Sequence, residues 1–188
     1  MPDSRRTGHR TRLFRCRSWV GAVIFFFFGF GLYAQSLDLA AEPWDVRFES
    51  CLPREKQCHD KLATSPRSIR MLLPENLHSR VPWFYGEVVF SRQFIYDSAM
   101  AARVPDLLIL GSIGSTDETR LNGILLGKEG HHTQNSVVSA WNKVRAYDLP
   151  RGALRQGINT IQIKVTVLDH KAGIHAGPLK LTDENSDR

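Results

Sequence analysis

The chain of 188 residues is 42% hydrophobic and 23% charged, a globular composition with room for one ordinary domain. This excludes collagen-like, wholly disordered and large multi-domain architectures. The formal net charge is +6, but the first eighteen residues hold six arginines and one acid and so contribute +5 of it. Because the rest of the chain is nearly neutral, the composition argues against nucleic acid as a partner.

The N-terminal segment has the pattern of an export signal. Residues 19–34 contain no charge and follow the arginine-rich stretch directly. A basic region, a short apolar region and a small residue at Ala34 predict a signal peptide over residues 1–34. Sixteen residues span only about 24 Å as a helix, less than a ~30 Å hydrocarbon core. The alternative is an uncleaved membrane anchor, the only route by which we expect the protein to contact a membrane.

Both alternatives predict an exported protein, in the periplasm or associated with the cell envelope. The cysteines agree with this expectation. Cys16 lies in the N-terminal segment, which leaves Cys51 and Cys58 in the body of the chain. An even pair in an exported chain predicts a local disulfide. A zinc site would need two further ligands, and only His59 is adjacent, so we expect neither metal nor cofactor.

Short apolar runs predict β-strands, and helical periodicity is almost absent. In the clearest run, Ile161, Ile163, Val165 and Val167 share one face and polar residues occupy the other. In chain order, the predicted strands cover residues 44–49, 68–73, 84–96, 106–111, 120–126, 144–149, 159–168 and 179–181.

Turn residues separate these strands. Asn122-Gly123 lies between two apolar residues and predicts a hairpin, because a type I′ turn needs positive φ at both central positions. Gly111 ends the apolar run 106–111, which we expect to be a central strand, and Gly114 follows three residues later. We expect these two glycines to mark a strand end where backbones approach closely.

Little of the chain is predicted to be helical. Residues 151–155 look like one helical turn after Pro150, residues 53–66 look like a polar loop, and residues 182–188 like a disordered tail. About eight short strands with turns between them predict an all-β fold, an antiparallel jelly-roll β-sandwich over residues 35–181.

The order of features in the second half is more specific than any single motif. The chain contains, in this order, VVFSRQF, LLILGSIGSTDETRLNGILLGKEG, AWNKVRAYDLP and LRQGINTIQIKV. This order resembles the galactose-binding-domain-like sandwich at the N-terminus of family 2 glycoside hydrolases. It is still more similar to exported sensory modules of bacterial signalling proteins. The resemblance covers residues 44–181 and implies that Asp117 holds a neighbouring loop by hydrogen bonds.

The resemblance implies an accessory role without an active site. Nothing in this chain corresponds to the catalytic barrel of the hydrolases, or to the membrane helices and output domain of the signalling proteins. Four acids could be imagined as a hydrolytic pair, but we expect solvated or structural carboxylates. Four histidines raise the question of a metal site, but adjacent histidines on an extended chain point opposite ways and rarely bind one ion together, so we expect the histidine doublet to lie in a surface loop. The acids are Glu87, Asp117, Glu118 and Glu129; the histidines are His131, His132, His170 and His175.

Trp141 and its polar neighbours are the best candidate binding residues. A sugar ring has an apolar face and a polar rim, so an aromatic side chain, an amide and a guanidinium suit it. Trp141, Asn142 and Arg145 supply these groups, and Asp117 and Arg120 could join them. The structural alternative is that Trp141 belongs to the core, as we expect of Trp44 and Trp83.

These observations favour an exported, non-catalytic module that binds a carbohydrate or another small polar ligand. The alternative is a sensory or protein-interaction module whose partner is an envelope protein. An accessory domain of a glycoside hydrolase is the third reading, and it depends on the resemblance alone.

Overall fold

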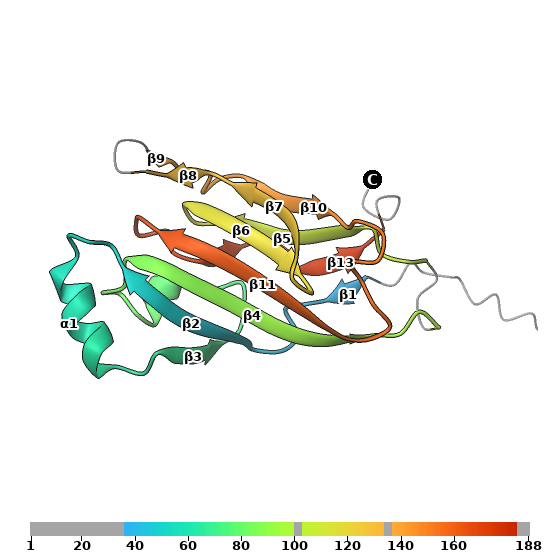
Figure 1. Cartoon of the computed structure of the whole chain (residues 1–188), viewed down its shortest axis with the longest axis horizontal. Helices are drawn as coiled ribbons and strands as arrows, with labels where there is room; N and C mark the ends of the chain where they lie inside the picture. Colours follow the sequence, from blue (N-terminus) through green and yellow to red (C-terminus); the bar gives the residue numbers. More distant parts are fainter. Residues whose placement is uncertain (1–35, 100–102, 134–136, 184–188) are drawn as a thin grey trace, which may run out of the picture. The chain divides into compact units, whose positions relative to one another are not determined.

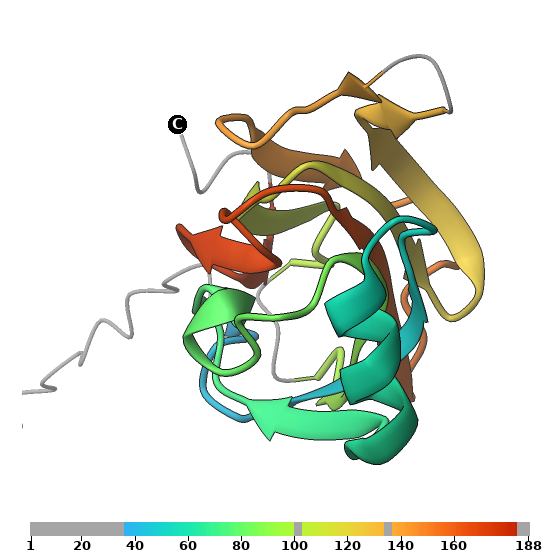
Figure 2. The same ribbon diagram turned by 90° about the vertical axis from the view of Figure 1, so that its left-hand side faces the viewer.

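Two antiparallel β-sheets lie face to face in the computed structural model, as Figures 1 and 2 show. The structure describes residues 36–99, 103–133 and 137–183. All of them belong to the compact unit Leu32–Arg188. The predicted signal segment, residues 1–34, lies outside the described residues.

The larger sheet has six strands and carries the longest pairings. Its two central strands, β4 and β11, run antiparallel over their whole length. Its strand order is β3 (Ser68–Met71), β2 (Trp44–Cys51), β4 (Gly86–Tyr96), β11 (Gly157–Val167), β6 (Thr116–Leu121) and β7 (Ile124–Glu129).

The smaller sheet is built around β5, which confirms the prediction of a central strand at this position. It contains β1 (Leu37–Asp38), β13 (Lys180–Thr182), β5 (Leu107–Ile113) and β10 (Val144–Asp148), and β12 (Ile174–Ala176) also pairs with β5. A two-stranded ribbon joins β8 (His131–His132) to β9 (Val137–Val138), so the histidine doublet, predicted to lie in a loop, forms a short strand. Thr182, predicted to begin the tail, ends β13 and is buried.

The core lies between the two sheets and follows the period-two pattern of the sequence. Ile161, Ile163 and Val165 of β11 are fully buried, whereas the polar residues between them face solvent. Trp44 is fully buried, as predicted, whereas Trp83 is only partly buried and packs against the core from its rim. The all-β sandwich predicted from the sequence is the observed fold.

The predicted hairpin joins β6 to β7. Asn122 and Gly123 have φ angles of 52° and 83°, as a type I′ turn requires. The Asn122 amide donates to the carbonyl of Ala153 at 2.8 Å and to the Asn159 side chain at 2.7 Å. The turn is therefore fastened to the start of β11.

Two local predictions were wrong. Residues 53–66, predicted to be a loop, contain helix α1 (Lys56–Thr64), and residues 151–155 form turns instead of a helix. Only Cys58 and Leu62 of α1 are buried, so its apolar face is too narrow for the periodicity to stand out. A short 3₁₀ helix, Leu77–Ser79, was not predicted. Within the described ranges no helix is both long and apolar enough to cross a membrane.

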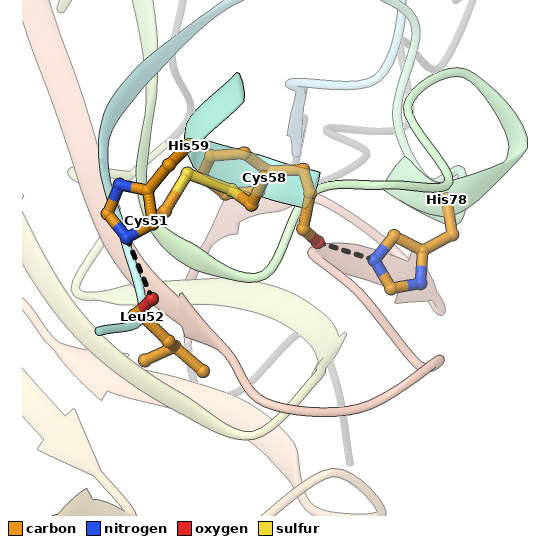
Figure 3. Close-up of a disulfide and its surroundings, with 6 residues drawn as sticks. Cys51, Leu52, Cys58, His59 and His78 are labelled. Carbon is orange, nitrogen blue, oxygen red and sulfur yellow. Dashed lines mark hydrogen bonds between the residues drawn. A yellow bond between two sulfur atoms is a disulfide. The ribbon is translucent and has the colours of Figure 1, made fainter. Parts of the chain in front are cut away.

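The predicted disulfide joins Cys51 at the end of β2 to Cys58 in α1, as Figure 3 shows. The Cα atoms are 5.8 Å apart. His59, considered above as a metal ligand, instead hydrogen-bonds to the carbonyl of Leu52 at 3.1 Å. The disulfide therefore links helix α1 to strand β2 of the larger sheet.

Candidate functional site

A buried ion pair connects the two sheets beneath the loop that carries Trp141. Nε of Arg145, on β10, donates to Oδ1 of Asp117, on β6, at 2.5 Å, and both side chains are fully buried. The hydroxyls of Tyr147 and Thr119 donate to Oδ2 of Asp117 at 2.7 and 3.2 Å. Burial and the hydrogen bond to Asp117 raise the pKa of the Tyr147 hydroxyl well above its usual value.

The remaining nitrogens of Arg145 hold the loop. Nη1 donates to the carbonyl oxygens of Ala140 and Lys143, both at 2.6 Å, and Nη2 donates to the carbonyl of Ile113 at 3.1 Å. The Ala140 amide also bonds to the carbonyl of Ser115 at 2.9 Å. The turn that presents Trp141 is thus fixed by a charged group with no solvent exposure, and Asp117 acts on the loop through Arg145.

Trp141 lies at the surface on this turn, and 41% of it is exposed. The Lys171 ammonium lies 3.7 Å from the centre of the indole ring, within cation–π range. His175 hydrogen-bonds to the backbone of Trp141, and burial lowers the pKa of this imidazole. An aromatic surface, an ammonium and an imidazole therefore meet at one end of the sandwich.

The structure separates the five predicted binding residues into three places. Trp141 and Asn142 lie at solvent on the turn, whereas Arg145 and Asp117 lie below it with no surface open to a ligand. Arg120 is on the opposite face of β6 from Asp117, and pairs with Glu118 at 2.7 Å.

Lys171 and His175 were not predicted to belong to this site. The sequence feature that points to their neighbourhood is Gly114, because the backbone of Lys171 packs directly against it. An added Cβ at Gly114 would lie only 1.4 Å from the carbonyl oxygen of Lys171. An added Cβ at Gly111 would lie 2.1 Å from the carbonyl oxygen of Ala176. These contacts confirm the predicted close approach at the two glycines. They bring the segment after β11 beside the Trp141 turn.

The four acids considered for hydrolysis all form ion pairs. Asp117 faces the core, whereas Glu118, the next residue, faces outward and pairs with Lys128 at 2.5 Å. Glu87 pairs with Lys164 at 2.9 Å, and Glu129 pairs with Lys143. No group of three or more potential metal ligands occurs in residues 36–99, 103–133 and 137–183.

Comparison with solved structures connects this fold with glycoside hydrolases. The chain is similar to part of a rhamnosidase from Novosphingobium sp. PP1Y, with 18% identity, a TM-score of 0.52 and coverage of 78% of this chain and 14% of the enzyme. A GH2 β-galacturonidase from Eisenbergiella tayi has 11% identity and a TM-score of 0.55, and the match covers 79% of this chain and 24% of the enzyme. A β-glucuronidase from an uncultured Clostridium sp. has 15% identity and a TM-score of 0.54, and the match covers 80% of this chain and 29% of the enzyme.

These similarities establish a shared β-sandwich fold, and the chain spans less than a third of each of these enzymes. No family model and no curated protein matches the sequence. The predicted resemblance to a domain of family 2 glycoside hydrolases is confirmed at the level of the fold.

Proposed function

We propose that this protein is an exported, non-catalytic module that binds a carbohydrate or another small polar ligand at the Trp141 end of the sandwich. The observation that carries the proposal is the exposed indole of Trp141 on a turn held by the buried guanidinium of Arg145. A fixed aromatic surface loses little conformational entropy on binding. Asn142 and Lys171, beside the indole, supply polar groups for the rim of a sugar ring.

The fold supports the same ligand class. The structural neighbours are named as a rhamnosidase, a β-galacturonidase and a β-glucuronidase, and this chain corresponds to a minor part of each. The Cys51–Cys58 disulfide fits an exported protein, because disulfides persist in oxidising compartments. Since Lys171 places a positive charge at the indole, sugar acids are the first ligands to compare with neutral sugars.

A thermal-shift panel tests the proposal with glucose, galactose and rhamnose against glucuronate and galacturonate. A ligand at one hundred times its dissociation constant should add about 2.7 kcal/mol of stability, or several degrees in Tm. Trp141→Ala should abolish the shift and leave the protein folded. Leu125→Ala is the matched control, because Leu125 is 42% exposed on β7, away from this turn. A shift that survives Trp141→Ala would place the ligand elsewhere.

A protein-contact role is the second candidate. Ile95 and Ile158 lie opposite each other on β4 and β11 and are 72% and 68% exposed. The two isoleucines form a small apolar patch, and contiguous exposed apolar patches mark contact surfaces. Under this alternative, the double variant Ile95→Ser with Ile158→Ser would lose an envelope partner in a pull-down, and the sugar panel would stay flat.

A further inference from the structure

The outer face of the six-stranded sheet carries a polar groove away from the Trp141 turn. A hollow of about 420 Å³ lies over four strands. We call it the outer groove and define it by the residues Asp45, Arg70, Ser91, Gln93, Thr160 and Gln162. The strand register aligns four of them across the sheet, because Asp45 lies opposite both Arg70 and Ser91, and Ser91 lies opposite Gln162.

The outer groove continues beyond this hollow in both directions along the strands. A hollow of about 250 Å³ shares Asp45, Ser91 and Gln162 with it, and extends to Arg47 and Val89. A third, of about 440 Å³, shares Arg92 and Gln93 and ends at the exposed isoleucine pair on β4 and β11. From Val89 to Ile95 the strand advances about 20 Å, which suits a chain of several sugar units better than one sugar.

The groove holds uncommitted hydrogen-bonding groups. In the described part of the chain, no intramolecular side-chain hydrogen bond engages the hydroxyls of Ser91 and Thr160 or the amides of Gln93 and Gln162. Hydroxyls and amides both donate and accept, as the hydroxyl groups of a saccharide do. Four such groups on adjacent strands therefore match a polyhydroxylated ligand.

The charges of the groove are balanced. Over the three hollows the lining contains two acids, Glu42 and Asp45, and three arginines, Arg47, Arg70 and Arg92. Arg47 is neutralised by Glu49, next to the groove, at 2.6 Å. Arg70 pairs with Asp45 at 3.3 Å, and Nη2 of Arg92 lies 3.7 Å from Glu42. A balanced lining gives no electrostatic preference for an anionic or a cationic polymer. We therefore expect a neutral ligand here, in contrast to the positive charge beside Trp141.

The buried side chain of Arg92 holds one wall of the groove, the segment before β2, in place. Arg92 is 8% exposed, and its Nη1 donates to the carbonyl oxygens of Leu39 and Glu42. These bonds hold the segment before β2, including Pro43, against the floor. Because the floor consists of paired strands, the groove is formed before a ligand arrives, which lowers the entropic cost of binding.

We propose that the outer groove binds an extended neutral oligosaccharide, with the isoleucine pair at its end packing against the apolar faces of the sugar rings. This inference shares the ligand class of the proposed function but uses a different surface. An experiment can therefore refute the proposal for either site without refuting the other.

Titration calorimetry on the full chain tests the groove with cellohexaose, xylohexaose, mannohexaose, laminarihexaose and maltohexaose, each beside its monosaccharide. We expect one of the five hexasaccharides to bind at least about tenfold more tightly than its own monosaccharide. Thr160→Arg fills the middle of the groove and should weaken this binding by about tenfold or more. Thr166→Arg is the matched control, six residues along the same face of β11, and should leave the affinity within about twofold.

The outcomes distinguish the two sites. Loss of binding with Thr160→Arg and not with Trp141→Ala supports the groove. Loss with Trp141→Ala alone overturns it and assigns the glycan to the loop end. No binding by any of the five hexasaccharides also overturns it, and Thr160→Arg then shows by pull-down whether this face docks another protein instead.

Discussion

The Lys171 ammonium and the Trp141 ring form a cation–π contact at 3.7 Å, on two loops thirty residues apart in sequence. Lys171→Met keeps the length of the side chain and removes its charge. An exposed contact of this kind contributes about 0.5–1 kcal/mol, so we expect a loss of that size in urea unfolding. Lys164→Met is the control, because its ion pair with Glu87 is exposed and should be worth less. Equal losses in the two variants would contradict the prediction.

His175 should make the stability of the domain depend on pH. Burial holds the pKa of His175 below its usual value; the hydrogen bond to the Trp141 backbone and the charge of Asp169 oppose this shift, and repulsion from Lys171 and Arg145 adds to it. The folded state therefore binds the proton less readily than the unfolded state. The contribution of neutral His175 to the free energy of unfolding is complete above about pH 6.5. It is lost as the pH falls from there through the pKa of His175 in the folded state.

Unfolding of the wild-type protein and of His175→Asn between pH 8 and pH 5 measures this effect. The difference in unfolding free energy between the two should change only below about pH 6.5, with the wild type losing more. NMR titration of the His175 ring should give a pKa below the usual value. A ring that titrates at or above about 6.5 would refute the interpretation.

The ion pair between Asp117 and Arg145 should be costly to break. Asp117→Asn keeps the shape but leaves a buried guanidinium without its counter-charge, so we expect a loss of about 3–5 kcal/mol. Faster hydrogen exchange at the Ala140 amide should accompany it, because Arg145 holds that turn. Glu118→Gln, one residue away on the solvent face, should cost about 1 kcal/mol or less. Similar losses from both would show that burial of the pair is unimportant.

Gly114 should tolerate no side chain. A Cβ there would lie 1.4 Å from the carbonyl oxygen of Lys171, so Gly114→Ala must displace the backbone beside the Trp141 turn, at a cost of about 3 kcal/mol. Gly123→Ala separates steric crowding from backbone strain. Its φ is +83° but nothing lies within 4 Å, so about 1 kcal/mol is expected. Chemical denaturation of both variants compares the two costs.

Removing the disulfide should act mainly on α1. The Cys51→Ser, Cys58→Ser double variant frees a loop with a sequence separation of 7, for which chain entropy predicts a loss of about 2–3 kcal/mol. Hydrogen exchange should rise in Lys56–Thr64 and stay low in β4 and β11. The wild-type protein in reductant should behave like the double variant, and an unchanged Tm in both would contradict the expectation.

Most of the longer strands could be predicted because each has its own apolar pattern. In β11, alternation alone defines the buried face, and in β6–β7 the Asn122-Gly123 pair defines the turn. Helix α1 could not be predicted because two buried residues and a disulfide stabilise it, instead of a broad apolar face. The strands β1 and β12 have two and three residues, and they form only where β13 and β5 supply partners.

The site was predicted in part. The sequence places Trp141 and Asn142 beside Arg145, but it cannot show that Arg145 is buried, since arginine is usually exposed. Lys171 joins through contacts between loops that leave no local pattern. The outer groove was missed because it depends on which residues of four strands lie opposite one another, and this register follows from the assembled sheet.

Burial of Arg145 also limits how β10 can pair. Along β10, Arg145 and Tyr147 face inward and their neighbours face outward. A shift of one residue against β5 would turn both side chains to solvent and leave the Asp117 carboxylate buried with no cation or phenol to meet it. Misaligned pairings would therefore carry an uncompensated charge, which apolar residues at these positions would not impose. The ion pair thus favours one alignment of β10 over its shifted alternatives, and with it one position of the loop that precedes β10.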